Sequence, residues 1–433
     1  MSPVTADVSI LNDLEARGLV HDSTDRQALA ERLAEGPITV YYGCDPTADS
    51  LHHGNLVGLL VLRRFQDAGH RPVALAGGAT GMVGDPSGRS EERNLLDDAT
   101  LSANVAAIKR QMARVLDFDG GAVLVDNRDW TAGVTLLEFL RDVGKHVTVN
   151  QMLARESVKA RLAGEHGISY TEFSYMLLQA HDFLRLYADR GVEMQIGGSD
   201  QWGNILSGID LIRRVHGATA HGLSWPLLLA PDGSKLGKTA GARIWLDPAR
   251  TSPYQFFQHW MQTDDRQVRE FLAKFTLLPL TEVEAIAADH LDHPERRSGQ
   301  RRLASEVTRL VHGDEAAEAA AQAAAVLFGG SPLEAGPGAL AAVAAEVPTA
   351  PLPSPAELDE GADLVPLLVE SGLASSKGDA RRSLDQGAVS VNGVKVGPDS
   401  ALRAGDVLHG RYVLLRKGKR NYALLVNGAP GSA

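Results

Sequence analysis

A histidine, a glycine and an asparagine stand at the start of a predicted helix, at His52, Gly54 and Asn55. His52 and Asn55 are three residues apart, so they share one face of the helix if it begins there. A helix N-terminus favours anions, and Gly54 lets a ligand approach the backbone closely. Two hydrogen-bond donors in this position fit a polyphosphate. The alternative is that Asp49 or Ser50 caps the helix and the histidine is an exposed surface residue.

A glycine-rich loop follows a second predicted strand, with four glycines among residues 77–84. Such density indicates unusual backbone angles or close ligand contact, although the spacing does not match G-x-G-x-x-G. Asp85 could hold an ammonium group, and Arg89 and Arg93 could reach phosphate. The alternative is a long solvated loop.

Residues 173–184 form a predicted helix that is apolar nearly all round. Tyr175, Gln179 and Asp182 fall within one stripe of roughly 60° on its surface. A helix of this kind should be buried, and a stripe facing solvent would more typically carry Lys or Glu. The pattern therefore favours a polar cavity over a solvated face.

Two further loops carry polar groups. After a short strand, Gly197 and Gly198 lead to Ser199 and Asp200, either of which could cap a helix. Farther along, a loop at 232–239 has two lysines three residues apart that could close over phosphate. It is not a Walker A loop, because Asp232 occupies the position of the first glycine. Each loop alone is equally typical of a capped helix or a solvated turn.

The elements that must position these groups alternate between strand-like and helix-like segments. Strands are predicted at 37–43, 73–76 and 122–125, with a helix at 56–65, and residues 250–310 look helical. Alternation of this kind predicts a parallel sheet with crossover helices. Ligands of such sheets bind at the carboxyl ends of the strands, where the polar groups lie.

Charge divides the chain unevenly. The 433 residues carry 43 basic and 54 acidic side chains, a net charge of −11. Residues 362–433 hold ten basic and six acidic side chains, a net of +4, so the rest carries −15. The segment 310–376 has no Lys or Arg. Its first part, 314–327, is predicted to be the end of an Ala-rich helix, and the prolines of the remainder predict a semi-extended linker. A basic tail on an acidic body favours RNA contact over a merely solvated charged face.

Composition excludes several classes of protein. Hydrophobic residues make up 44% and charged residues 22%, as in ordinary globular proteins. No apolar run approaches the length that spans a membrane, and no secretory signal is visible. Cys44 is the single cysteine, so we expect a small packing residue and a reducing, cytoplasmic setting.

In this order, the motifs resemble those of the bacterial-type tyrosyl-tRNA synthetases, which are class I aminoacyl-tRNA synthetases, over residues 11 to 426. Residues 52–55 are similar to the class signature His-x-Gly-His, with Asn55 in place of its last histidine. Residues 235–239 are similar to the mobile lysine signature. Asparagine keeps a donor but cannot be protonated, so its contribution could be smaller.

The resemblance implies an amino-acid pocket. In it, Tyr41 and Asp182 would hydrogen-bond the phenol hydroxyl of L-tyrosine. The other implied contacts are Asp85, Tyr175 and Gln179 around the ammonium group, and Gln201 near the carboxylate.

The resemblance also implies an ATP site and a catalytic set. The implied ATP contacts are Asp45, His52, Gly54, Asn55, Gly198, Asp200, Lys235, Lys238 and Thr239. The implied catalytic residues are Thr47, His52, Asn55, Arg89, Arg93, Lys235 and Lys238. Mg²⁺ would be carried with ATP, with no dedicated metal site on the protein. Because a carboxylate attacks the α-phosphorus without a general base, positioning and charge stabilisation can carry the reaction. The adenylate would then acylate the terminal ribose of tRNA.

The basic tail resembles an S4-type RNA-binding fold. Ser376 opens a predicted helix, and Asn392-Gly393 is typical of a hairpin turn. The candidate RNA contacts are Lys377, Arg381, Arg382, Lys395, Arg416, Lys417, Lys419 and Arg420.

The expected fold is therefore α/β. A Rossmann-like catalytic domain is expected at 1–245, with an insertion around 126–170. An α-helical anticodon-side domain (246–328), a Pro/Ala-rich acidic linker (329–361) and an α+β S4-like domain (362–433) are expected to follow. The resemblance implies tRNA as partner and a homodimer. Two alternatives are tryptophan activation, which Tyr41 and Asp182 disfavour, and an RNA-binding protein whose synthetase domain is inactive.

Overall fold

The computed structural model describes residues 9–87, 96–164, 167–229 and 243–427. The chain divides into two units, described separately below. The first comprises Met1–Thr251 and Thr263–Leu303, and the second Ser252–Gln262 and Ala304–Ala433. Within the described residues, no helix combines the length and apolarity needed to cross a membrane.

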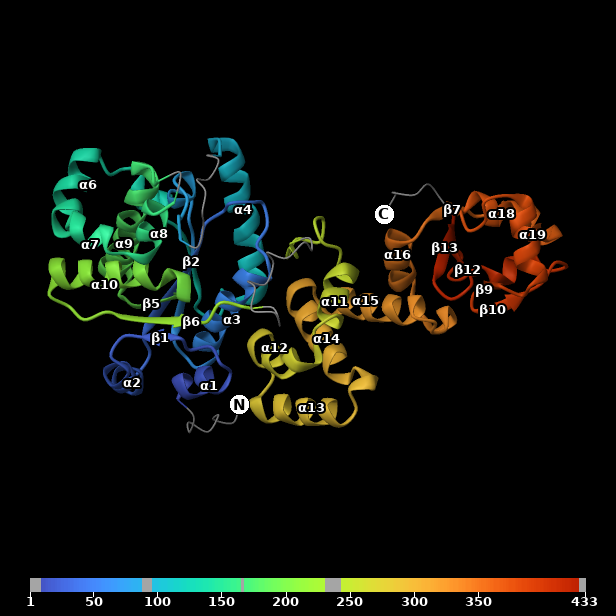
Figure 1. Cartoon of the computed structure of the whole chain (residues 1–433), viewed down its shortest axis with the longest axis horizontal. Coiled ribbons are helices and arrows are strands. Elements are labelled where there is room, and N and C mark those ends of the chain that lie inside the picture. The colour runs from blue at the N-terminus through green and yellow to red at the C-terminus, as the bar shows by residue number, and fades with distance from the viewer. Residues whose placement is uncertain (1–8, 88–95, 165–166, 230–242, 428–433) are drawn as a thin grey trace. The chain divides into compact units, whose positions relative to one another are not determined.

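The first unit is built on a six-stranded sheet of order β1-β6-β5-β2-β3-β4 (Figure 1). Only β1 is antiparallel to its neighbour. The chain runs outward from β2 through β3 to β4, and then returns to place β5 on the other side of β2. This reversal makes the carboxyl ends of β2 and β5 the expected ligand site of the sheet. The strands are β1 (Asp22–Ser23), β2 (Thr39–Cys44), β3 (Arg71–Ala76), β4 (Val123–Asp126), β5 (Val192–Gly198) and β6 (His221–Trp225).

Helices cover both faces of this sheet. On one face Tyr42 lies against Gly58 of α3, where any larger residue would collide with the tyrosine ring. On the other, Tyr41 packs in a cluster with Phe183 of α9 and Leu211 of α10. The helices before β5 are α1 (Ile10–Ala16), α2 (Arg26–Ala34), α3 (His53–Asp67), α4 (Asp98–Val115), α5 (Arg128–Thr131), α6 (Leu136–Asp142), α7 (Val149–Leu153), α8 (Glu156–Leu162) and α9 (Tyr170–Arg190). After it come α10 (Trp202–His216), α12 (Val268–Phe275), α13 (Leu280–Asp292) and α14 (Ser298–His312), with α14 crossing into the second unit.

The strands and the two helices predicted in this part of the chain are confirmed, with ends shifted by a few residues. The expected α/β fold with a Rossmann-like sheet is confirmed, and the described sheet is parallel except for β1. The contacts nevertheless divide residues 246–328 between the units, because α11 (Pro253–Met261) packs on α15 (Asp314–Leu327) of the second unit.

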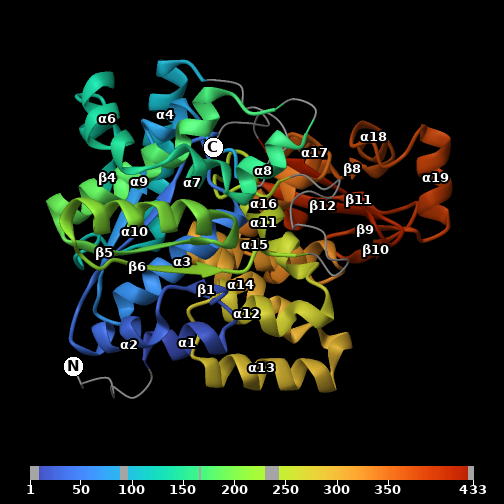
Figure 2. The same ribbon diagram turned by 60° about the vertical axis from the view of Figure 1, so that its left-hand side comes forward.

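The second unit contains a five-stranded sheet of order β10-β9-β12-β13-β7, seen from another angle in Figure 2. The strands of this unit are β7 (Thr349–Pro351), β8 (Ala362–Asp363), β9 (Val389–Val391), β10 (Val394–Val396), β11 (Ala401–Leu402), β12 (Tyr412–Lys417) and β13 (Asn421–Val426). Its further helices are α16 (Pro337–Glu346), α17 (Pro355–Glu360), α18 (Leu364–Glu370) and α19 (Lys377–Asp385).

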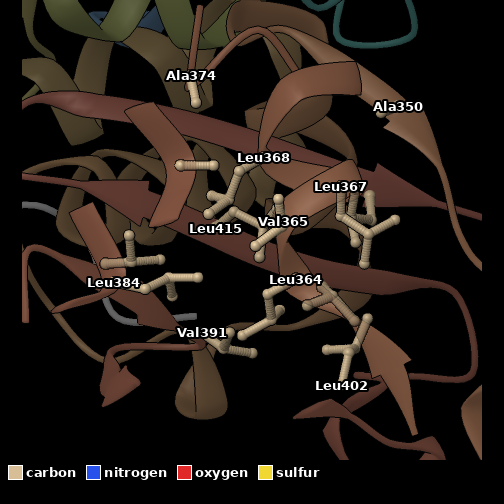
Figure 3. Close-up of a cluster of buried hydrophobic side chains, with 14 of the residues drawn as sticks. Ala350, Leu364, Val365, Leu367, Leu368, Ala374, Leu384, Val391, Leu402 and Leu415 are labelled. Carbon is tan, nitrogen blue, oxygen red and sulfur yellow. The ribbon is translucent and has the colours of Figure 1, made fainter. Parts of the chain in front are cut away.

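Two apolar layers enclose this sheet. Figure 3 shows one of them, in which Leu364 and Leu368 of α18 and Leu384 of α19 meet Val391 and Leu415 of the sheet. The opposite face packs against α15 and α16 through a separate cluster; its members include Ala323, Val326, Leu340, Leu414, Tyr422 and Leu424. Successive residues of each strand therefore point into different layers, as pleating requires.

The expectation of a linker at 329–361 is wrong. This segment contains α16, β7 and α17, and β7 pairs in parallel with β13 of the sheet. The prolines misled because Pro337 and Pro355 each stand at the start of a helix. Proline is accepted there, since that backbone N–H has no partner within the helix.

The hairpin predicted at Asn392-Gly393 in the basic tail is confirmed. Asn392 and Gly393 adopt φ angles of 47° and 86° between β9 and β10, as the favoured two-residue turn requires. The basic segment after β12 turns at Gly418 into β13. Ser376 caps α19 through its side chain, also as predicted.

Candidate active site

Polar side chains gather at the carboxyl ends of the central strands of the first unit. Asp45 follows β2, Thr80 follows β3 and Asn127 follows β4. Thr80 donates to Asp45 over 2.7 Å, and Asn127 donates to Thr80 over 2.9 Å. One hydrogen-bonded chain thus links three strand ends.

Asp182 of α9 is the buried end of this chain, with 3% of its surface exposed. Its carboxylate accepts from Asn127 Nδ2 at 2.8 Å and from Trp130 Nε1 at 2.9 Å. Burial raises the pKa of Asp182 to about 7, although both hydrogen bonds oppose that shift. A carboxylate has about four acceptor positions, so this one can accept a further donor.

The hydroxyl of Tyr41 is buried and has no hydrogen-bond partner among the described residues. Its ring lies 5.3 Å from that of Phe183, beside Asp182 on α9. Burial, with a smaller contribution from the Asp182 charge, raises the pKa of Tyr41 well above its usual value. Leaving a buried hydroxyl unpaired costs free energy. A hydroxyl-bearing ligand that bonds both groups would remove this cost.

Tyr175 donates its hydroxyl proton to Asp45 over 2.7 Å. Gly77 lies so close that a Cβ there would collide with Asp45 and Thr80, and a Cβ at Gly78 would collide with Asp126. These glycines therefore let the loop pack on carboxylates of the protein itself. In the same loop only Gly84, with φ of 85°, needs the left-handed region.

A second network joins the remaining amino-acid candidates. Gln201 donates to Asp85 over 2.6 Å, and Asn204 donates to Gln179 and Gln201 over 3.0 and 3.2 Å. Asp85 also accepts from the backbone N–H of Ser87. The six amino-acid candidates thus come from β2 (Tyr41), the loop after β3 (Asp85), α9 (Tyr175, Gln179 and Asp182) and η3, Ser199–Gln201 (Gln201). All of them except Tyr41 share a hydrogen bond with a neighbouring polar group.

The start of α3 is held by the two signature residues themselves. His52 is the N-cap and accepts from the N–H of Gly54 through Nδ1, while Asn55 Oδ1 accepts from the N–H of His52. Neither Asp49 nor Ser50 is the cap. The Asn55 amide points its Nδ2 toward Cys44 Sγ, 3.9 Å away. Burial raises the pKa of the Cys44 thiol to about 12, so the thiol remains protonated and suits a packing role.

Other predicted residues are placed as follows. Thr47 is exposed beyond β2, Gly198 is buried at the end of β5, and Asp200 is exposed in η3. The α10 helix begins after Gln201, whose side chain makes no cap bond, so neither Ser199 nor Asp200 is the cap of this helix. Arg89, Arg93, Lys235, Lys238 and Thr239 lie outside the described residues. No cluster of three or more metal-ligating side chains occurs in the described part of the chain.

Sequence reasoning missed Thr80, Asn127, Trp130 and Asn204. Asn127 carried a usable signal, since it directly follows the predicted strand at 122–125. Trp130 and Asn204 carried none, because their roles depend on which strand ends and helices meet in space.

The basic candidates in the second unit are spread over three places. Lys377, Arg381 and Arg382 are exposed on α19, and Lys419 and Arg420 are exposed at the hairpin tip. Lys417 pairs with Asp379 at 2.8 Å. The remaining two, Lys395 and Arg416, lie on β10 and β12.

Comparison with known proteins matches both units. Residues 33–329 match the family model described as tRNA synthetases class I (W and Y). Residues 340–425 match the model of the tyrosine–tRNA ligase SYY-like C-terminal domain. The second match begins before residue 362, in agreement with the position of α16 and β7.

Relatives and solved structures agree with these matches. The chain is 53% identical to a tyrosine–tRNA ligase of Opitutus terrae, over 96% of this chain and 99% of that one. It is 48% identical to one of Citrobacter koseri, over 98% and 99%. A truncated mitochondrial tyrosyl-tRNA synthetase of Aspergillus nidulans is similar in structure, with a TM-score of 0.68 and 32% identity over 75% of this chain and 95% of that one.

Proposed function

The chain belongs to the tyrosine–tRNA ligase family of class I synthetases, and from that premise we propose how its residues carry the reaction. The activity is ATP-dependent: L-tyrosine and ATP give tyrosyl-adenylate and pyrophosphate, and the tyrosyl group then passes to the 3′ ribose of tRNA. The single observation that carries the assignment of the pocket is the buried pair formed by the unpartnered Tyr41 hydroxyl and the Asp182 carboxylate.

The phenol of the substrate fits this pair. Its hydroxyl would donate to Asp182 and accept from Tyr41, satisfying both. Asn127 and Trp130 fix the carboxylate from behind, so little reorganisation is needed on binding. Asp85, Tyr175 and Gln179 would hold the ammonium group, which the two carboxylates Asp45 and Asp85 attract.

The ATP end of the site would lie at the start of α3 and the end of β5. Asp45, Gly198 and Asp200 would contact the adenosine, while Thr47, His52, Gly54 and Asn55 would face the phosphates. His52 and Asn55 are engaged in capping, so their contribution includes holding the helix N-terminus in place. Arg89, Arg93, Lys235, Lys238 and Thr239 would close over the pyrophosphate, and Mg²⁺ would arrive with ATP.

Residues 1–245 would therefore carry both substrate sites, and 362–433 would contact tRNA. The exposed cations of α19 and of the hairpin tip support RNA contact. We also propose a cytoplasmic location, in keeping with the reduced setting expected for the single cysteine.

The homodimer is supported by an apolar surface between β4 and α9. Five exposed leucines and one exposed valine lie on three short helices there, with Leu137 78% and Val149 60% exposed. Large apolar surfaces of this kind usually mark an interface. The set is Leu136, Leu137 and Leu140 on α6, Val149 and Leu153 on α7, and Leu162 on α8.

Sedimentation tests the dimer. Leu137→Asp should shift the protein toward monomer at micromolar concentration. The matched control is Leu291→Asp on α13, where the leucine is 76% exposed but lies outside this surface. A dimer unaffected by Leu137→Asp, or lost equally with Leu291→Asp, contradicts the proposed interface.

Pyrophosphate exchange tests the function itself. Exchange should depend on L-tyrosine, while phenylalanine and tryptophan should support little. Exchange driven by tryptophan would favour the alternative amino acid. If no amino acid supports exchange but the protein binds tRNA, the result would favour an inactive synthetase domain.

A further inference from the structure

A cavity of about 290 Å³ opens on the sheet of the second unit. Its floor is formed by residues of β9, β12 and β13, and its wall by the segment that follows α15. The lining includes Gly329, Gly330 and Pro332 of that segment, with Ser390, Arg416 and Tyr422 of the sheet. The volume is at the lower end of small-ligand sites.

The three sheet residues form one row across neighbouring strands. Ser390 of β9 lies opposite Arg416 of β12, and Arg416 lies opposite Tyr422 of β13. Residues paired in this way have their Cβ atoms about 5 Å apart. On the outer side, Lys395 of β10 lies opposite Ser390 and extends the row. The order across the sheet is cation, hydroxyl, cation, hydroxyl.

All four side chains leave the sheet on the same face. Val391 and Leu415, the neighbours of Ser390 and Arg416, point into the apolar layer drawn in Figure 3. Because strand side chains alternate, Ser390 and Arg416 must point the other way, toward the cavity. Tyr422 belongs to the cluster on that same opposite face.

The two hydroxyls of this row lack hydrogen-bond partners in the described part of the chain. Ser390 and Tyr422 are 2% and 8% exposed, and neither hydroxyl has a hydrogen-bond partner among the described residues. No acidic side chain in the described part of the chain pairs with Arg416 either. Lys417, the next residue, does have such a partner in Asp379. Buried hydroxyls without partners are uncommon and need an explanation.

We propose that this row is a binding site for a backbone phosphate of RNA. This inference rests on the proposed tRNA ligase function and adds the contact by which the second unit holds its RNA. A phosphodiester offers the acceptor oxygens that one guanidinium and two hydroxyls require. Lys395, paired with Ser390 on the neighbouring strand β10, adds a second cation outside the cavity lining, while the sugar attached to the phosphate occupies the remaining space.

The test uses the full chain and a tyrosine-accepting tRNA. Arg416→Gln should weaken tRNA binding about tenfold and lower the slope of affinity against salt by about one ion. Ser390→Ala and Tyr422→Phe should each weaken it about threefold, with tyrosine-dependent pyrophosphate exchange unchanged throughout. The matched controls are Arg403→Gln, an exposed arginine outside the row, and Ser383→Ala, whose hydroxyl is bonded within α19.

Ethylation of tRNA phosphates provides a readout that a loss of folding would not imitate. With the wild type, ethylation at one phosphate should interfere with binding, and with Arg416→Gln the interference at that position should disappear while other positions keep theirs. If Arg416→Gln and Tyr422→Phe bind tRNA as tightly as the controls, the proposal is overturned and the ligase function stands.

Inorganic phosphate distinguishes the source of the ligand. If millimolar phosphate stabilises the wild type but not Arg416→Gln, and tRNA binding is the same for both, the site takes free phosphate and the RNA contact is wrong. If the wild type exchanges pyrophosphate with tyrosine but binds no tRNA, both the RNA contact and the transfer step fail. If neither activity occurs, the proposed function fails as a whole.

Discussion

Two tyrosine hydroxyls, one in each unit, are buried without a partner in the described structure, and their neighbours differ in charge. Tyr41 lies close enough to Asp182 for that charge to act on its hydroxyl, whereas Tyr422 pairs with Arg416 in the register of β12 and β13. A hydroxyl can donate or accept, so alone it says little about its ligand. The adjacent charge decides: the first site suits a ligand that donates a proton, and the second suits one that supplies only acceptors.

The two sites are also held differently. Asp182 is fixed by donors from Asn127 and Trp130, which come from a different part of the chain. Among the described residues no side chain bonds the hydroxyl of Ser390 or of Tyr422, and the order of the row follows from the register of neighbouring strands. The first site therefore depends on a polar network, and the second on backbone pairing.

The largest effect expected from this comparison is that of Asp182→Asn. The amide N–H of an asparagine would face groups that are themselves donors, Asn127 and Trp130. The charged acceptor for the phenol hydroxyl of the substrate would be lost. Bonds to charged groups are worth about 1.5–3 kcal/mol, so kcat/KM for tyrosine in pyrophosphate exchange should fall about 100-fold. Affinity for tRNA should not change. Asp189→Asn, on the exposed side of the same helix, serves as control; a comparable loss there would mean that the effect is not specific.

The second largest effect expected is a difference between the two sites in how binding depends on pH. The phenol donates best to an ionised Asp182, whose pKa is raised to about 7. The ionised fraction of Asp182 falls from about one half at pH 7 to about one eleventh at pH 6, so the KM for tyrosine should rise about fivefold. Binding of tRNA by Arg416 should stay flat over that range, because arginine does not titrate there. A KM that stays constant between pH 6 and 8 would contradict the raised pKa.

The same shift affects stability with a definite sign. Asp182 has a higher pKa in the folded protein than in the unfolded chain, so the folded state binds the proton more tightly. Its contribution to the free energy of unfolding should decline as pH rises from about 4 to about 7. Asp182→Asn should remove this decline in urea unfolding measured at several pH values.

Removing each hydroxyl should produce opposite outcomes of intermediate size. Tyr41→Phe should raise the KM for tyrosine about fivefold and leave tRNA binding intact, since a neutral hydrogen bond is worth about 1 kcal/mol. Tyr422→Phe should weaken tRNA binding, as measured by filter binding, and leave the KM for tyrosine unchanged. If both variants lose the same activity, the contrast between the two sites is wrong.

The smallest effect is expected from Gly393→Ala in the hairpin beside the row. Its φ of 86° is unfavourable for alanine, so urea unfolding should show a loss of about 1 kcal/mol. Affinity for tRNA should fall less than twofold, because the register is held by three further strands. Gly397→Ala, where the backbone is ordinary and a Cβ meets open space, should be nearly neutral.

Features that depend on local residue spacing could be predicted from the sequence, whereas those that depend on residues distant in the sequence could not. Tyr175, Gln179 and Asp182 were predictable as one stripe, because helical spacing places them together. Asn127 and Trp130, which donate to Asp182, lie more than 50 positions from it in the sequence. No local sequence pattern predicts a contact between residues so far apart. The Asn392-Gly393 hairpin could likewise be predicted, whereas the pairing of β9 with β12 could not.

Proline content was misread for a related reason. The same residue that breaks a helix interior begins a helix well, and only its position relative to the helix separates the two cases. At 329–361 that position was not visible before the alanine-rich α16 was seen to be buried on the sheet.

The parallel pairing of β7 with β13 has a consequence for synthesis on the ribosome. β7 is made before its partner strand β13, which is among the last residues of the described chain. Translation proceeds at roughly 5–20 residues per second, so β7 has no partner for several seconds while the residues between them emerge. During that interval its edge can pair with other chains, and Pro351, which carries no N–H, limits such pairing at one end of the strand.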